Sequence, residues 1–192
     1  MPTRLRRHAR RVKVIIYRET LFDHKEHFWT FLGAFVGIGL LGLLNRHHLP
    51  PADAPLLIGS FGASSVLVYG VINSPLAQPR NLVGGHVLSA LIGVSVFRLL
   101  GQEPWLAAAL AVALAIVGMQ ITRTLHPPGG ATALIAVIGS PQLKALGYWY
   151  VLVPVLSGVL ILLAVALVFN NLTPTRRYPA NKYWYRFWQR GY

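Results

Sequence analysis

The sequence predicts an all-α membrane protein with four full transmembrane helices and two shorter, broken helical segments. Of its 192 residues, 54% are hydrophobic and 12% are charged, and the mean hydropathy is +0.51. Soluble domains carry about 25% charged residues. Four apolar runs are long enough to cross a hydrocarbon core about 30 Å thick. Two further apolar segments of about ten residues, or about 15 Å of helix, reach only halfway.

The four long runs define the predicted full transmembrane helices. Aromatic side chains near their ends are typical anchors at the membrane–water interface, and we expect Trp29, Trp105, Trp149 and Tyr150 to serve this purpose. The runs themselves are Phe28–Leu44, Leu82–Leu100, Trp105–Ile121 and Tyr148–Phe169.

The two short segments repeat one pattern. The first begins Gly62-Ala63-Ser64 and ends at Ser74-Pro75, and the second begins Gly130-Ala131-Thr132 and ends at Ser140-Pro141. We expect a break before each Gly-Ala pair, so that two half-helix starts face a shared polar cavity. The repeats then cover about 28–100 and 104–170. If neither short segment crosses the membrane, the chain crosses four times. If both cross, it crosses six times with an inverted 3+3 repeat, a recurrent transporter plan that we favour.

Basic residues gather at both ends of the chain. Residues 1–27 hold eight Lys and Arg against three acids, and 173–192 hold five more. In a soluble protein the net charge of +13 would suggest nucleic acid, but here the basic ends flank the transmembrane domain at 28–172. The positive-inside rule then predicts cytoplasmic termini in a multi-pass inner-membrane protein, next to lipid headgroups and not nucleic acid. We expect a surface helix at Leu5–Phe28 and an aromatic anchor at Tyr183–Trp188.

Acidic and thiol groups are scarce. After Glu26 the only carboxylates are Asp53 and Glu103, and the chain has no cysteine. The sequence therefore lacks the side chains needed for paired-carboxylate catalysis, for carboxylate-ligated metals and for thiolate chemistry. We expect no enzyme activity, no metal and no cofactor.

The second break carries the most distinctive string, His126-Pro127-Pro128-Gly129-Gly130-Ala131-Thr132. The two prolines stop a helix and force extended backbone before them, whereas the glycines allow close approach. A helix that starts here presents a partial positive charge, which suits a small anion. His126 and Arg123 lie at this start and could assist.

The first copy offers Gly62, Ala63, Ser64 and Ser65, and polar groups follow it before the next span. Gln78, Arg80, Asn81 and His86 fall within nine positions. A histidine inside a span needs a partner or a cavity.

Three strings resemble the HPP family of integral membrane proteins, over about residues 25–172. They are Gly-Ser-Phe-Gly-Ala-Ser at 59–64, Ser-Pro-Leu-Ala-Gln-Pro-Arg-Asn with Gly-Gly-His at 74–86, and His-Pro-Pro-Gly-Gly-Ala-Thr-Ala at 126–133. The resemblance implies a small membrane protein, usually described with four spanning helices. Some members are linked to nitrite transport, which implies an anion-transport role for His126, Ser64 and Arg80.

We therefore expect a transporter or channel for a small inorganic anion such as nitrite, acting as a homo-oligomer. The alternative is a non-transporting scaffold or accessory protein, in which the histidines and hydroxyls only satisfy backbone and the arginines set topology. The candidate substrate-binding residues are His126, Gly129, Gly130, Ala131, Thr132, Gly62, Ala63, Ser64, Ser65, Gln78, Arg80, Asn81, His86 and Arg123.

Overall fold

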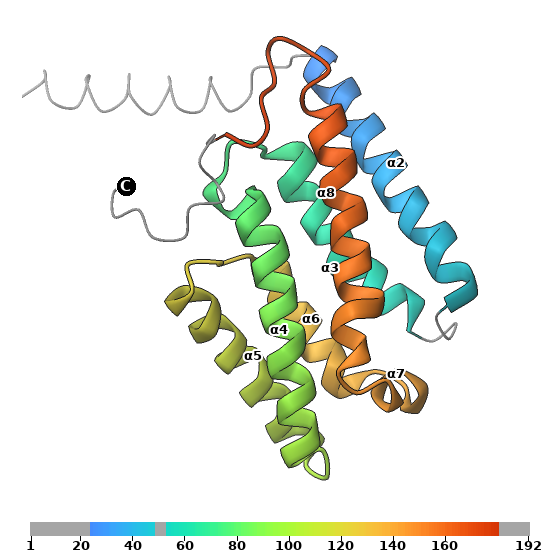
Figure 1. The fold of residues 1–192 in the computed structure, drawn as a ribbon, viewed down its shortest axis with the longest axis vertical. Coiled ribbons are helices and arrows are strands. Elements are labelled where there is room, and N and C mark those ends of the chain that lie inside the picture. The colour runs from blue at the N-terminus through green and yellow to red at the C-terminus, as the bar shows by residue number, and fades with distance from the viewer. Residues whose placement is uncertain (1–23, 49–52, 181–192) are drawn as a thin grey trace, which may run out of the picture.

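A computed structural model describes residues 24–48 and 53–180, which fold into a bundle of helices (Figure 1). The predicted surface helix at Leu5–Phe28 and the aromatic anchor at Tyr183–Trp188 lie wholly or mostly outside the described residues. The elements in chain order are α2 (His24–His48), α3 (Ala54–Ser65), the π-helical η1 (Val66–Gly70), the 3₁₀-helical η2 (Pro75–Ala77), α4 (Pro79–Leu100), α5 (Pro104–Ile121), α6 (Pro127–Ile138), α7 (Pro141–Ala145), the π-helical η3 (Val151–Leu156) and α8 (Ser157–Phe169).

Among the described residues, four helical stretches are long and apolar enough to cross a membrane. They are His24–Leu44, Pro79–Leu100, Pro104–Ile121 and Val151–Phe169, which confirms the four predicted runs. Large apolar side chains such as Leu99 and Trp105 point outward, as expected of a surface that contacts lipid. On α5 the inward face carries small residues, Ala107, Ala111 and Ala115, which allow neighbouring helices to approach closely.

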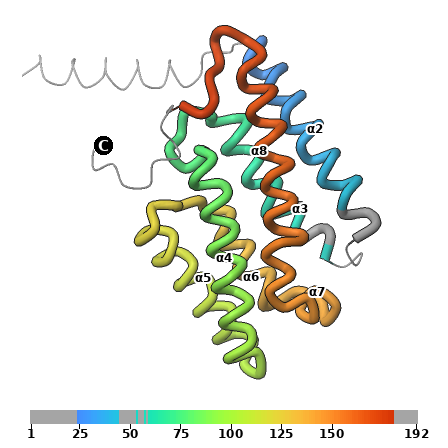
Figure 2. The backbone as a smooth tube through the Cα atoms, viewed as in Figure 1, coloured from blue at the N-terminus to red at the C-terminus, as the bar shows by residue number. Residues whose placement is uncertain are grey.

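Hydrogen bonds locate two opposite ends of the bundle. We call the first the terminal end, because Arg176, beyond α8, bonds there to Glu26 in α2 and to the carbonyl of Tyr69 in η1. At the same end the chain traced in Figure 2 turns from η1 through η2 into α4, and Tyr178 bonds to Ala77 of η2.

We call the second end the α7 end. Asp53, which precedes α3, accepts hydrogen bonds there from the backbone N–H and hydroxyl of Ser140, which follows α6. The guanidinium of Arg98, near the end of α4, lies 4.9 Å from the ring centroid of Tyr148 just before η3. The α3–η1 segment and α6 therefore run between the same two ends as the long helices.

The predicted break before Gly130 is present. His126 has extended backbone (φ −141°, ψ 104°), and α6 begins directly after it at Pro127. Because proline lacks an N–H and disfavours helix in the residue before it, Pro127 and Pro128 set this boundary. The helix ends at Ile138, just before Ser140-Pro141, as the repeated pattern predicts.

The predicted break before Gly62 is wrong. Helix α3 begins at Ala54 and continues through Gly59 and Gly62 to Ser65, where it passes into η1. A glycine inside a helix costs only about 1 kcal/mol, so tertiary packing overrides it, whereas a proline pair does not allow the helix to continue. The start of α3 lies at the α7 end beside Ser140. The expected pair of facing half-helix starts is therefore not formed, and only α6 brings a helix start to the site.

Helices α4 and α6 cross at very short distance because glycines face each other there. A Cβ added to Gly85 would lie 2.6 Å from the Cβ of His126, and one added to Gly129 would lie 2.9 Å from the carbonyl oxygen of Gly85. Any larger side chain at either position would separate the helices. This contact sets His86 of α4 beside His126.

Candidate functional site

Five polar side chains are buried together between α3, α4 and α6, whose arrangement Figure 1 shows. None is more than 2% exposed. We call them the imidazole–hydroxyl cluster, and its members are Ser60, Ser64, His86, His126 and Thr132.

Ser64 joins the two imidazoles. Its Oγ lies 2.8 Å from Nε2 of His86 and 2.9 Å from Nε2 of His126, and the two ring centroids are 5.0 Å apart. The same hydroxyl lies 3.2 Å from the carbonyl oxygen of Ser60, one turn earlier on α3. A single hydroxyl group therefore serves both histidines.

The outer nitrogens of the imidazoles are also bonded. Nδ1 of His126 lies 2.8 Å from the carbonyl oxygen of Leu76. Nδ1 of His86 lies 2.7 Å from Oγ1 of Thr132, which lies 2.9 Å from Oγ of Ser60. The Ser60 hydroxyl can also donate to the carbonyl oxygen of Pro128, at 3.0 Å. The contacts form one continuous chain from Leu76 to Ser60 and Pro128.

The groups that meet occupy matching positions of the two Gly-Ala-hydroxyl patterns. Ser64 and Thr132 are the third residues of the two Gly-Ala-hydroxyl patterns, and they bond to opposite nitrogens of His86. Ser60 and Pro128 each lie two residues before the glycine of their pattern, and they bond to each other. The repeated positions therefore converge from α3 and α6 on one histidine of α4.

The surroundings of the cluster are apolar. The ring of Phe61 lies 5.4 Å from that of His86, centroid to centroid. Among the described residues, the hydrogen bonds of the cluster run to one another and to backbone carbonyls, and not to a charged side chain. Buried polar groups are tolerated when they are hydrogen-bonded, and every nitrogen and hydroxyl of this cluster is. Chemically, the cluster offers polarisable N–H and O–H donors deep inside an apolar bundle.

Several predicted residues lie near the cluster without joining it. The amide of Asn81 donates to the carbonyl of Leu125 at 2.8 Å, and Arg80 donates to that of Thr122 at 2.6 Å. Both hold the segment before α6 against the start of α4. Gln78 donates to the carbonyls of Ile72 and Ser74, at the terminal end.

The remaining candidates do not join the hydrogen bonds of the cluster. Arg123, Ala63 and Ala131 are exposed, and Gly62 and Gly130 are half-buried. The hydroxyl of Ser65 donates to the carbonyl of Phe61 on its own helix. Gly129 packs against α4, as described above. The structure thus brings together Ser64, His86, His126 and Thr132 from the predicted set.

Sequence reasoning missed two residues. Ser60 belongs to the cluster, and its equivalence to Pro128 in the repeat is the signal that could have identified it. Tyr150, which we expected at the membrane interface, is only 1% exposed, and its hydroxyl donates to the carbonyl of Thr132 at 3.0 Å. A tyrosine near the start of an apolar run can occupy either environment, so the sequence alone does not separate them.

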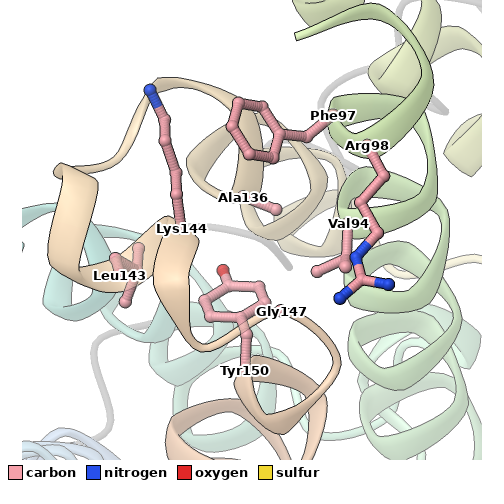
Figure 3. A pocket seen from close by; sticks show the side chains of 8 residues that line it. All are labelled: Val94, Phe97, Arg98, Ala136, Leu143, Lys144, Gly147 and Tyr150. Carbon is pink, nitrogen blue, oxygen red and sulfur yellow. The ribbon is translucent and has the colours of Figure 1, made fainter.

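A pocket of about 100 Å³ lies at the α7 end, and Tyr150 lines it (Figure 3). Arg98 and Lys144 line it on opposite sides, and the ring of Tyr150 lies between them. Nζ of Lys144 is 5.2 Å from the ring centroid of Phe97. Gly147 has φ +53°, and a Cβ there would lie 2.9 Å from Nη2 of Arg98, so this glycine leaves room for the guanidinium.

In the described part of the chain, no three His, Cys, Asp or Glu residues form a group that could hold a metal ion. The histidines of the cluster are bonded to hydroxyls and to a backbone carbonyl instead.

Comparison with known proteins identifies similar sequences. A family described as HPP, transmembrane region, matches residues 19–179. A transmembrane protein of Dictyostelium discoideum is 48% identical over 172 residues, which cover 88% of this chain and 59% of that protein. A second Dictyostelium discoideum transmembrane protein is 47% identical over 161 residues, covering 82% and 51%. The chain thus spans a little more than half the length of these relatives. No solved structure matches it.

Proposed function

The chain belongs to the HPP transmembrane family, and on that premise we propose that it carries a small inorganic anion, such as nitrite, across the membrane. The observation that carries the proposal is the imidazole–hydroxyl cluster. Polar residues inside membrane spans are costly and most often mark the path of a substrate or ion. Two histidines that share one serine fit that description, and one of them, His126, lies at the helix break before Pro127.

The chemistry of the cluster suits a small oxyanion. Nitrite has oxygen atoms that accept hydrogen bonds, and the cluster supplies hydroxyl and imidazole donors. The start of α6 adds the positive end of a helix dipole, which favours an anion. In the structure these donors bond to one another, so an anion would enter by replacing some of those contacts.

The pocket at the α7 end offers a first binding site for the anion. Arg98 and Lys144 give it two cations, and Tyr150 separates it from Thr132. Positive charge around a recess raises the local concentration of anions. We therefore propose that the pathway runs from this pocket past Tyr150 to the cluster.

We further propose six crossings in an inverted repeat. In support, the first set of three elements is α2, α3–η1 and α4, and its chain starts at the terminal end. The second set is α5, α6 and α8, and its chain starts at the α7 end, so each element runs opposite to its counterpart. An even number of crossings keeps both basic ends on one side, which the positive-inside rule makes cytoplasmic, and we propose the inner membrane as the site. We also propose a homo-oligomer, because 21.1 kDa is small for a transporter.

A flux measurement tests the function. The full chain is reconstituted into liposomes, and uptake of nitrite, nitrate, formate and chloride is compared with that of protein-free liposomes of the same lipid. We expect protein-dependent uptake of nitrite and of at least one similar planar anion. If none of the four anions moves faster than in protein-free liposomes, the scaffold alternative holds, and the cluster only joins α3, α4 and α6.

The role of the pocket has its own test. Arg98→Gln and Lys144→Gln each remove one cation, whereas Arg177→Gln removes an exposed cation at the terminal end. Because the pocket acts by concentrating the anion, we expect the first two to raise the half-saturating nitrite concentration about three- to tenfold with little change in maximal flux. Equal half-saturating concentrations for all three variants would contradict the proposed pathway.

A further inference from the structure

We infer that the imidazole–hydroxyl cluster takes up one proton for each anion carried, so that the proton on its histidine pair is the counter-charge of the anion. This inference rests on the proposed function. It follows from the number of hydrogens available to the hydrogen bonds of the cluster, which admit a neutral arrangement and a singly protonated one.

In the neutral cluster the direction of every bond is determined from one end. A carbonyl oxygen only accepts, so Nδ1 of His126 carries the hydrogen that is donated to Leu76. Nε2 of His126 then needs a donor, and the hydroxyl of Ser64 supplies it at 2.9 Å instead of donating to the carbonyl oxygen of Ser60 at 3.2 Å. With that hydrogen used, Ser64 can only accept from Nε2 of His86.

The same reasoning continues past His86. A neutral imidazole carries one hydrogen, so Nδ1 of His86 accepts from the hydroxyl of Thr132, which in turn accepts from Ser60. All hydrogen bonds therefore point from Ser60 towards Leu76.

A proton added to His126 reverses that direction as far as Ser60. Nε2 of His126 now donates to Ser64, whose hydroxyl hydrogen turns to His86, and Nδ1 of His86 donates to Thr132. Thr132 then donates to Ser60, and the hydroxyl of Ser60 turns to the carbonyl oxygen of Pro128. Each bond between neighbouring members from His126 to Ser60 is kept with its direction reversed, and the hydroxyl of Ser60 now donates to Pro128. The cluster therefore accepts one proton without an unsatisfied nitrogen or hydroxyl.

The charges around the cluster explain why an anion would need this proton. On α3 and α6 no charged side chain is present. The two arginines of α4 are bonded or placed elsewhere: Arg80 donates to the carbonyl oxygen of Thr122, and Arg98 lines the pocket. Among the residues that the structure describes, the one further titratable group that faces the cluster is Tyr150, through the carbonyl of Thr132. A lone anion in a medium of low dielectric constant is strongly disfavoured. The protonated histidine pair supplies the missing positive charge.

The step balances without bond changes in the anion. One proton from water binds an imidazole nitrogen, one anion enters beside it, and both leave together on the other side. The net charge moved is zero, so a pH difference drives the transport and the membrane potential does not.

The test applies the pH difference and the membrane potential separately in liposomes. Nitrite uptake is measured once with a pH difference at zero potential, and once with a potassium–valinomycin potential at equal pH, with protein-free liposomes subtracted. We expect the pH difference, acid outside, to drive uptake and the potential to have no effect. Uptake driven by the potential at equal pH would overturn the inference while leaving the proposed function standing.

A second measurement does not depend on transport. Histidine labelled with ¹⁵N is followed by NMR in the full chain in lipid nanodiscs, and His86→Gln and His126→Gln identify the two signals. As the pH is lowered, we expect the signals of the two wild-type histidines to change together, in one step that binds one proton. In Ser64→Ala the two signals should separate, whereas Ser89→Ala, which removes a buried hydroxyl bonded to the sulfur of Met119, should leave them coupled. Independent responses of the two histidines in the wild type would refute the inference even if no anion moves.

Discussion

At the scale of single residues, the hydroxyl of Ser64 holds the cluster together. It is the only described side chain within hydrogen-bond distance of both imidazoles, and its one hydrogen decides which imidazole accepts. A serine inside a helix usually bonds to the carbonyl one turn earlier, and Ser64 lies at 3.2 Å from that carbonyl too. The two shorter contacts to the histidines give this serine a part in a network and not only in its own helix.

Thr132 gives a test of stability at this scale. In Thr132→Val the side chain keeps its shape but loses the hydroxyl that bonds to His86 and Ser60. Leaving a buried imidazole nitrogen without a partner costs about 1–3 kcal/mol, so we expect a lower thermal unfolding temperature in detergent. Thr173→Val, whose hydroxyl bonds only to the exposed Thr175, should change it little. Similar shifts in both variants would show that the cluster is not tightly bonded.

The candidate site could be predicted from sequence only in part. His86, His126, Ser64 and Thr132 stood out because a polar residue in an apolar run needs a reason. Arg80, Asn81 and Gln78 stood out in the same way, yet they bond to backbone carbonyls at the terminal end. A polar side chain that joins the cluster and one that only bonds to backbone carbonyls both lie near a helix break. The two cases differ in which helices pack together, and a local sequence pattern does not contain that information.

At the scale of elements, the close crossing of α4 and α6 positions the cluster. Gly85 and Gly129 lie at this crossing, and a second contact is made at Gly93, whose Cβ would lie 2.9 Å from the Cα of Ala133. Without a strong hydrophobic driving force between helices in lipid, such small-residue contacts supply the packing. The distance between His86 and His126 therefore depends on glycines that carry no chemistry.

Gly85→Ala tests this dependence. The added methyl group would meet His126 and the carbonyl oxygen of Thr124, and overpacking of this kind costs about 1–3 kcal/mol. We expect a lower unfolding temperature and, because His86 moves away from His126, a lower nitrite flux. Gly39→Ala in α2, where nothing lies within 4 Å of the added carbon, is the matched control and should retain both. A Gly85 variant as stable and as active as the control would contradict the assigned packing.

The elements also show which sequence signals were reliable. Long apolar runs gave the four spanning helices to within about four residues at each boundary, because a run of that length is needed to cross the hydrocarbon core and is uncommon in soluble domains. The break at Pro127 was correct because proline removes a donor and restricts its neighbour. The break at Gly62 was wrong because glycine permits irregular backbone without requiring it.

At the scale of the whole molecule, Arg176 joins the chain beyond α8 to the rest of the bundle. Only 4% exposed, it donates to Asn170, to the carbonyl of Tyr69 and to Glu26 of α2. Burial lowers the pKa of its guanidinium, and Glu26 beside it opposes that shift. Arginine stays protonated in proteins, so the contact is a charged one. From sequence this residue was one of several basic tail residues, because Glu26 and Tyr69, two of its partners, lie far away in the chain.

Arg176→Ala should therefore destabilise the bundle. Removing one partner of a buried charged network costs about 3–5 kcal/mol, and Tyr69 and Asn170 would lose their donors. We expect a clear fall in the unfolding temperature in detergent, whereas Arg177→Ala, at the exposed neighbouring position, should behave as the wild type. If the two variants unfold at the same temperature, Arg176 does not hold the terminal end together.

The most direct test of the transport site is nitrite flux through Ser64→Ala, compared with Ser89→Ala, at equal amounts of folded protein in liposomes. Folding of both variants is checked beforehand by gel filtration and thermal unfolding. Both substitutions remove one buried hydroxyl, but only the first separates the two histidines. Since the lost bond joins groups that become charged, we predict at least about a tenfold fall in flux for Ser64→Ala and nearly unchanged flux for Ser89→Ala. Equal flux through the two variants would contradict the claim that the cluster is the transport site.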